Sequence, residues 1–157
     1  MKKILLLFTA TIWVNSNMPE APPMNWKLIA EQNKRRSESL TPRNVYDYLI
    51  RSNVLYADIV FRQVLHETGN LTSRLCREKN NLFGMTHTIN STPPKLEFIL
   101  YPNWKESVMA YKRWQDRHRF KGRDMSDYYH FLENVKYATD SLYTMKLKKI
   151  NIQKYLL

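Results

Sequence analysis

Apolar side chains recur along most of this chain at the three- and four-residue spacing of amphipathic α-helices. The clearest helix is predicted over about residues 55–68. Its inward face consists of Tyr56, Ile59, Val60, Gln63, Val64 and Glu67. The face ends in the carboxylate of Glu67, and Gly69 follows as a residue that readily ends a helix. The pattern therefore directs an acidic side chain towards positions that core residues occupy.

Residue types that favour helix starts mark further helical segments. Thr41 followed by proline predicts a helix over 42–50, because proline is favoured at the first helical position. Asn103, with a glutamate three residues later, resembles a capping box and predicts a helix over 104–114. The other predicted N-caps are Thr72 for a short helix through Cys76, Ser126 for a helix through Leu132 and Asp140 for a helix through Ile150.

Between these helices the apolar pattern changes to that of strands. Residues 84–89 and 96–100 are β-prone segments on either side of the polar, proline-containing sequence 90–94, which is typical of a hairpin. The chain has no internal repeat and only three glycines, which favours helices over a β sandwich. We therefore predict a mainly α domain with a small β-hairpin lobe.

The first residues have the layout of a secretory signal peptide. Lys2 and Lys3 precede an apolar run over 4–14 that is too short to span a bilayer comfortably. A buried N-terminal helix is the alternative. We assign residues 1–16 to a signal peptide, 17–40 to a linker or arm, and 41–157 to one domain. We expect export to the periplasm, the cell envelope or the extracellular space, without stable membrane insertion after removal of the signal.

The chain is strongly basic, with a formal net charge of +11. Without Lys2 and Lys3, 23 basic residues stand against 14 acidic ones, which leaves +9. Such a charge suits an anionic surface such as a cell envelope, and nucleic acid is the competing partner. Export and the scattered positions of the basic residues argue against nucleic acid.

Cysteine and histidine give no support for a metal site. Cys76 is the one cysteine of the chain, so neither an internal disulfide nor a cysteine-based metal cluster can form. The four histidines show no i, i+4 pair and no HExxH motif, the usual zinc signatures. No metal or organic cofactor is expected.

Glu67 is the best candidate for chemistry. A carboxylate at the end of an apolar helix face is poorly solvated, which should raise its pKa. A general acid that works near neutral pH needs such a raised pKa. The alternative is a carboxylate at a helix end that forms a salt bridge.

Three motifs in order resemble the bacterial glucosaminidase domains of glycoside hydrolase family 73 (mannosyl-glycoprotein endo-β-N-acetylglucosaminidase-like). The first runs from QVLHETG at 63–69 through SRL at 73–75 to KNNLFGM at 79–85. The second is YPNWKES at 101–107, and the third is YATDSLY at 137–143, with Ser141 where the family usually has proline. The match covers roughly residues 41–152.

The resemblance implies a lysozyme-like helical domain with a long groove that binds the glycan strands of peptidoglycan. It implies hydrolysis of the β-1,4 bond after N-acetylglucosamine. Glu67 matches the family's catalytic glutamate, and Tyr137 matches a tyrosine of the groove placed to touch the sugar or to stabilise charge at the reacting carbon; a core tyrosine is the alternative. The substrate-binding residues that the resemblance implies are Asn80, Asn81, Phe83 and Tyr143.

Ordinary two-carboxylate glycosidases need a second acid, about 5 Å from the first for retention and roughly 6.5 to 9.5 Å away for inversion. Glu97 is the acidic residue between Glu78 and Glu106, in the predicted hairpin, and it is the candidate. Strand alternation places Glu97 with Ile99 on one face, and a solvent-facing glutamate is the alternative. Assistance by the 2-acetamido group of the sugar would need no second carboxylate.

Two other functions remain open. One is a lytic transglycosylase or muramidase on a related fold, which would share the single glutamate at a helix end. The other is a catalytically silent domain that binds glycan or, through its charge, nucleic acid. The motifs favour an exported endo-N-acetylglucosaminidase with Glu67 as its general acid over both of these alternatives.

Overall fold

Helix α3 (Ala57–Glu67) lies at the centre of the fold, and most of its side chains are buried. The computed structural model describes residues 38–89, 95–120 and 124–157, together with residues 31, 91 and 93. The other elements are, in chain order, α2 (Pro42–Arg51), α4 (Arg74–Lys79), β1 (Thr86–Ile89), β2 (Lys95–Phe98), α5 (Trp104–His118), α6 (Met125–Asn134), α7 (Tyr143–Lys148) and the 3-10 helix η1 (Gln153–Tyr155). The predicted class, mainly α with a small β hairpin, is confirmed.

Two predicted helix starts are confirmed in atomic detail. The side chain of Thr41 accepts a hydrogen bond from the backbone N–H of Asn44, and Pro42 occupies the first turn of α2. The side chain of Asn103 accepts from the N–H of Glu106 at 3.1 Å, so it caps α5. Each of these caps satisfies a backbone donor that has no partner within its helix.

Two other predicted caps are wrong by one or two residues. Ser73 rather than Thr72 caps α4, because Thr72 Oγ1 donates to the carbonyl of Gly69 in the preceding turn. Asp124 rather than Ser126 caps α6, where it accepts from the N–H of Asp127 at 2.9 Å. Several neighbouring residues can serve as caps, and the path of the backbone selects one of them.

The start of α7 is also later than predicted. Asp140 does not cap the helix directly, because its Oδ1 accepts from the N–H of Leu142 at 2.9 Å in a turn. The helix begins only at Tyr143. This turn separates the 137–140 segment from α7.

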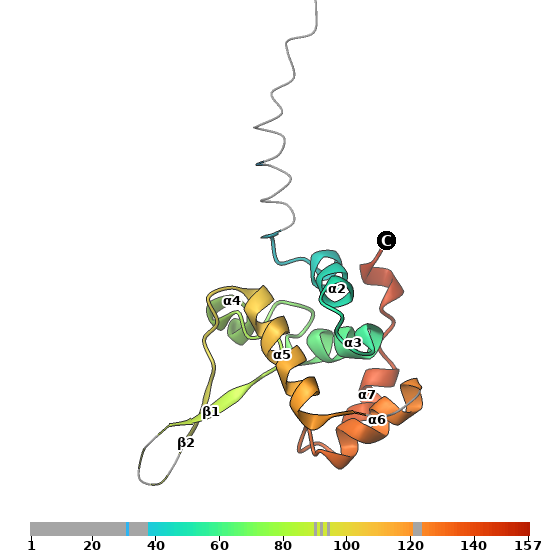
Figure 1. Cartoon of the computed structure of the whole chain (residues 1–157). Helices are drawn as coiled ribbons and strands as arrows, with labels where there is room; N and C mark the ends of the chain where they lie inside the picture. The colour runs from blue at the N-terminus through green and yellow to red at the C-terminus, as the bar shows by residue number, and fades with distance from the viewer. Residues whose placement is uncertain (1–30, 32–37, 90, 92, 94, 121–123) are drawn as a thin grey trace, which may run out of the picture.

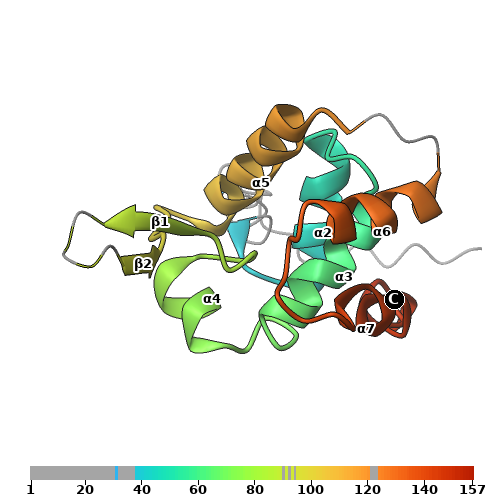
Figure 2. The same cartoon turned by 90° about the horizontal axis from the view of Figure 1, so that it is seen from below.

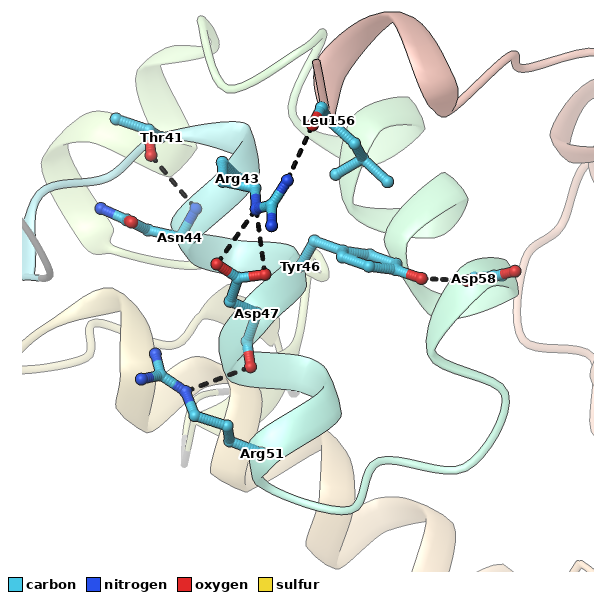
Figure 3. A network of polar contacts seen from close by, with 8 residues as sticks. All are labelled: Thr41, Arg43, Asn44, Tyr46, Asp47, Arg51, Asp58 and Leu156. Carbon is cyan, nitrogen blue, oxygen red and sulfur yellow. Dashed lines mark hydrogen bonds and ion pairs between the residues drawn. The ribbon is translucent and has the colours of Figure 1, made fainter.

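Polar contacts attach α2 to distant parts of the chain (Figure 3). The Tyr46 hydroxyl donates to Asp58 Oδ1 in the first turn of α3 at 2.6 Å. This hydrogen bond, helped by burial, raises the pKa of Tyr46 to about 12. Arg43 Nη1 donates to the carbonyl of Leu156 at 2.8 Å, so α2 also holds the C-terminal end of the chain.

Arg62 fixes α7 against α3. Its Nη1 donates to backbone carbonyls at the end of α7, those of Leu147, Lys148 and Ile150. Carbonyls at a helix C-terminus lack partners within the helix, and a cation there also complements the helix dipole. Because Arg62 belongs to α3, this contact sets the position of α7, and of Tyr143 at its start, relative to Glu67.

The β1–β2 ribbon projects away from the helices (Figures 1 and 2). The strands are antiparallel, with Thr86 opposite Phe98 and His87 opposite Glu97. Most ribbon residues are exposed. Asn81 holds the base of the ribbon, because its amide donates to the carbonyls of Met85 and Ile99.

The predicted signal peptide and most of the predicted arm lie outside the described residues. Over the residues that are described, no helix combines the length and apolar character needed to cross a membrane.

Candidate active site

Glu67, the last residue of α3, lies in a groove of about 950 Å³. The groove runs between the ribbon, one face of α5 and the loop after α6. Besides Glu67, its lining consists of residues 83–86, Leu96, Phe98, Ile99, Tyr101, Ala110, Arg113, Trp114, Arg117 and residues 135–139. Glu67 is the one acidic side chain among these lining residues.

The two oxygens of Glu67 have different surroundings. Oε1 accepts a hydrogen bond from the Tyr143 hydroxyl at 2.8 Å. Oε2 lies beside Gly84, where a Cβ atom would be 3.5 Å from it. Gly84 has a φ of +64°, a conformation that favours glycine, and it lines the groove with Glu67. Oε2 is therefore the oxygen that remains available to a ligand.

The pKa of Glu67 is raised, as expected from the sequence. Burial of the carboxyl is the main cause, and the Tyr143 hydrogen bond and the nearby His66 oppose it. Burial disfavours the charged form, whereas a donor to the carboxylate favours it. The balance leaves a carboxyl group that holds its proton to a higher pH than an exposed glutamate does.

A chain of buried hydrogen bonds supports Tyr143. Gln63 Nε2 donates to the Tyr143 hydroxyl at 3.3 Å, and Gln63 Oε1 accepts from the Tyr111 hydroxyl at 2.6 Å. The Tyr111 hydroxyl lies 2.9 Å from that of Tyr128, and Gln115 Nε2 donates to Tyr128 at 2.5 Å. The path thus runs from α6 and α5 through α3 to the carboxyl of Glu67.

The chain has one direction. Because Tyr111 gives its proton to Gln63, its oxygen must accept from Tyr128, which in turn accepts from Gln115. Every donor therefore points towards Glu67. Burial raises the pKa of Tyr111 well above its ordinary value and that of Tyr128 to about 12, so both hydroxyls keep their protons at neutral pH.

Tyr137 lines the groove beside Glu67. Its hydroxyl donates to the carbonyl of Phe83 at 3.1 Å, and its ring stacks against that of Tyr143 with centroids 5.7 Å apart. Burial, followed by the charge of Glu67, raises the pKa of Tyr137 well above its ordinary value. Phe83 also lines the groove, and its ring stacks on Tyr111 at 4.2 Å.

The structure does not bring Asn80 and Asn81 to the groove surface. Asn81 is buried, and its Oδ1 accepts from the N–H of Met85 at 3.0 Å while its amide donates to backbone carbonyls. Asn80 ends α4 with a φ of +52° and donates to the carbonyl of Tyr101 at 3.0 Å. Both amides satisfy backbone groups, so they shape the loop that carries Phe83 and Gly84.

Glu97 and Tyr143 are not part of the groove lining. In β2, Leu96 and Phe98 line the groove, whereas Glu97 between them does not. Glu97 as a second carboxylate beside Glu67 stays a prediction, which the groove lining does not support. Tyr143 reaches Glu67 from inside the fold and lines a separate cavity of about 440 Å³ between α6 and α7.

Sequence reasoning missed the contribution of α5. Ala110, Arg113, Trp114 and Arg117 follow a helical spacing that places them on one face, and this spacing is visible in the sequence. The buried glutamines were a second available signal, because a polar residue on a core face requires a partner. In the part of the chain that is described, no group of three or more His, Cys, Asp or Glu side chains is placed to hold a metal ion.

Comparisons with known proteins give one family match. The family model described as glucosaminidase, mannosyl-glycoprotein endo-beta-N-acetylglucosaminidase, matches residues 43–157. The catalytic domain of the autolysin Auto from Listeria monocytogenes is 21% identical, with a TM-score of 0.49, over 86% of this chain and 97% of that domain. The glycoside hydrolase domain of FlgJ from Salmonella typhimurium is 21% identical, with a TM-score of 0.48, over 72% of this chain and 80% of that domain. No curated protein matches.

Substitution of Tyr143 by phenylalanine should raise the pKa of Glu67 further. The tyrosine donates to the carboxylate and therefore lowers this pKa in the wild type, while burial would remain. Carbon-13 NMR titration of the glutamate carboxyls measures the change directly. Tyr155→Phe is the control, because its hydroxyl bonds Asn70 away from the groove. A Glu67 pKa that fell or stayed constant in Tyr143→Phe would contradict this account.

Proposed function

This chain belongs to the glucosaminidase family, and we propose that it is an exported peptidoglycan hydrolase that cleaves the β-1,4 bond after N-acetylglucosamine. The observation that carries the proposal is the position of Glu67: a carboxyl group with a raised pKa lies in a groove with one oxygen free. A general acid requires both the proton and an open path to the leaving group.

Glu67 acts as the general acid. Because Oε1 accepts from Tyr143, the proton resides on Oε2, next to Gly84. Oε2 donates this proton to the glycosidic oxygen as the bond to the anomeric carbon breaks. The Tyr143 hydrogen bond becomes stronger as Glu67 turns into a carboxylate, since bonds to charged acceptors are the stronger ones.

The 2-acetamido group of the sugar supplies the nucleophile. No second acid lies among the described groove residues, and Glu97 is not part of the lining, which supports this route over a two-carboxylate mechanism. The carbonyl oxygen of the acetamido group attacks the anomeric carbon while the leaving oxygen takes the proton of Glu67. Water then opens the cyclic intermediate and returns a proton to Glu67, so the configuration is retained.

Tyr137 is proposed to stabilise positive charge at the reacting carbon. Its hydroxyl proton is engaged by the carbonyl of Phe83, which leaves only oxygen lone pairs for a ligand in the groove. Lone pairs favour a carbon that becomes positive as the glycosidic bond breaks. Tyr137 therefore complements Glu67, which acts on the leaving oxygen.

Glu67→Gln should lower the rate of sacculus digestion by at least about 100-fold, because an amide cannot donate the proton. Mass spectrometry of fragments released from purified sacculi measures the loss, and wild-type fragments should end in reducing N-acetylglucosamine. Glu97→Gln is the matched control and should retain activity. Undiminished digestion by Glu67→Gln would refute the role of Glu67. Anhydro-sugar ends would identify a lytic transglycosylase, and glycan binding without lysis a silent domain.

The same substitution should stabilise the fold increasingly as the pH rises. Folding raises the pKa of Glu67 above its ordinary value of 4.5, so the folded chain binds this proton more tightly than the unfolded chain. The contribution of Glu67 to stability is complete below the unfolded pKa and is lost as the pH rises through the folded pKa. Glutamine does not ionise, so the Tm of Glu67→Gln relative to wild type should increase over that range. Calorimetry tests the sign, and a relative Tm that falls with pH would contradict burial of the acid.

Gly84→Ala should remove most of the activity at a small loss of stability. The new methyl would lie 3.5 Å from Oε2, where the glycosidic oxygen must approach, at a φ of +64°. Left-handed strain for a residue with a Cβ costs roughly 1–2 kcal/mol. Gly69→Ala is the control, since its φ of +55° imposes similar strain outside the groove. Sacculus digestion and thermal unfolding of both variants separate backbone strain from obstruction of Glu67 by the new methyl group. Equal activity of the two variants would argue against approach of the glycosidic oxygen to Oε2.

A further inference from the structure

One face of α5 presents basic side chains to the groove. Ala110, Arg113, Trp114 and Arg117 line it, at the spacing that places residues on one side of a helix. The two arginines are one turn apart, about 6 Å along the helix axis. Lys136, in the loop after α6, adds a third cation to the same lining.

Among the described residues, no ion pair or hydrogen bond engages the side chain of Arg113, Arg117 or Lys136. By contrast, Lys112 on another face of α5 pairs with Asp116 at 3.3 Å. All three residues are exposed, so their charges are open to an anion that enters the groove.

The opposite wall of the groove is apolar. Leu96 and Phe98 are 71% and 47% exposed, and both line the groove from the ribbon. Exposed apolar residues around a groove are typical of a binding surface. A ligand that matches both walls therefore has an apolar side and an anionic side.

A neutral polymer of N-acetylglucosamine complements only the apolar wall of the groove. It offers apolar sugar faces but no charge for the arginines. Strands of peptidoglycan also carry carboxylates, either on the peptide stems or, where a stem has been removed, on the lactyl ether of muramic acid. A guanidinium donates two parallel hydrogen bonds to a carboxylate, and the opposite charges strengthen both. The hydroxyl and acetamido groups of a neutral sugar carry no charge and cannot replace the carboxylate.

We propose that Arg113 and Arg117, with Lys136 at the rim, bind carboxylates carried by the glycan strand and thereby select acidic muramyl strands over neutral ones. The inference rests on the proposed function, since it concerns the substrate of the same groove. Arg113 and Arg117 are specificity residues here and take no part in proton transfer.

Binding without cleavage tests this selection. Proteins carrying Glu67→Gln, alone or with Arg113→Gln and Arg117→Gln, are sedimented with intact sacculi and with chitin. Their binding to the soluble, stem-free strands that an amidase releases from sacculi is measured by fluorescence anisotropy. The two arginine substitutions should weaken binding to sacculi by about tenfold or more, as for close charge pairs, and leave binding to chitin unchanged. Added salt should weaken binding to sacculi in the same selective way.

The arms of the experiment identify the source of the carboxylate. Binding that depends on the arginines with intact sacculi only assigns the site to peptide stems. Dependence with stem-free strands only assigns it to the lactyl carboxylate that the amidase frees, and equal dependence shows that the site accepts either carboxylate. The control Arg74→Gln/Arg77→Gln removes the same charge from α4, outside the groove lining, and should change neither. Equal losses on chitin and sacculi, or no loss on either intact sacculi or stem-free strands, would overturn the proposal.

Turnover of sacculi by the wild type separates this inference from the proposed function. If the wild type digests sacculi and Arg113→Gln/Arg117→Gln does so with an unchanged KM, the carboxylate site is wrong while the enzyme remains. If the wild type digests nothing, the hydrolase is wrong, and the binding arms still decide whether the groove selects anionic strands.

Discussion

The hydrogen bond from Tyr143 to Glu67 is the interaction on which the site depends. Burial alone would give a carboxyl group with a raised pKa but no preferred orientation. The tyrosine engages one oxygen from inside the fold, so the other is left on the groove side, next to Gly84. The same bond limits the rise in pKa, because it stabilises the carboxylate that proton transfer produces. The hydrogen bond from Tyr143 is therefore the single source of both the orientation and the acidity of the Glu67 carboxyl group.

That source is itself held by the core. Tyr143 receives a hydrogen bond from Gln63, Gln63 receives one from Tyr111, and the path continues to Gln115, which donates to the backbone of Leu55 just before α3. A buried polar group without a hydrogen-bond partner costs about 1–3 kcal/mol. Removal of one side chain from this path would therefore leave its neighbours unpaired, and each would incur that cost. Since the path begins near the start of α3 and ends at Glu67, its last residue, it fixes the acid relative to the whole helix.

Much of the fold follows from local pattern, whereas the site follows from contacts between distant residues. The apolar spacing predicted α3, and Thr41 and Asn103 marked helix starts, because these signals act within one turn. Glu67 was recognisable as a carboxylate at the end of a buried face. The roles of Gln63 and Asn81 were not, because their partners depend on the folded backbone: the Tyr143 hydroxyl is 80 residues away from Gln63, and Asn81 binds a carbonyl of Ile99. Alternation separated Glu97 from Leu96, but only the way the ribbon leaves the helices decides which face meets the groove.

The groove keeps its cations away from its acid. A cation near a carboxyl group favours the charged form and would lower the pKa of Glu67. Yet burial dominates that pKa, and among the charged side chains only His66 contributes to lowering it; Arg113, Arg117 and Lys136 do not. The basic face of α5 can therefore attract an anionic strand without removing the proton that cleavage of the strand requires. If the arginines lowered the pKa of Glu67, tighter binding of an acidic substrate would come with a weaker general acid, and the dominance of burial over that pKa avoids this conflict.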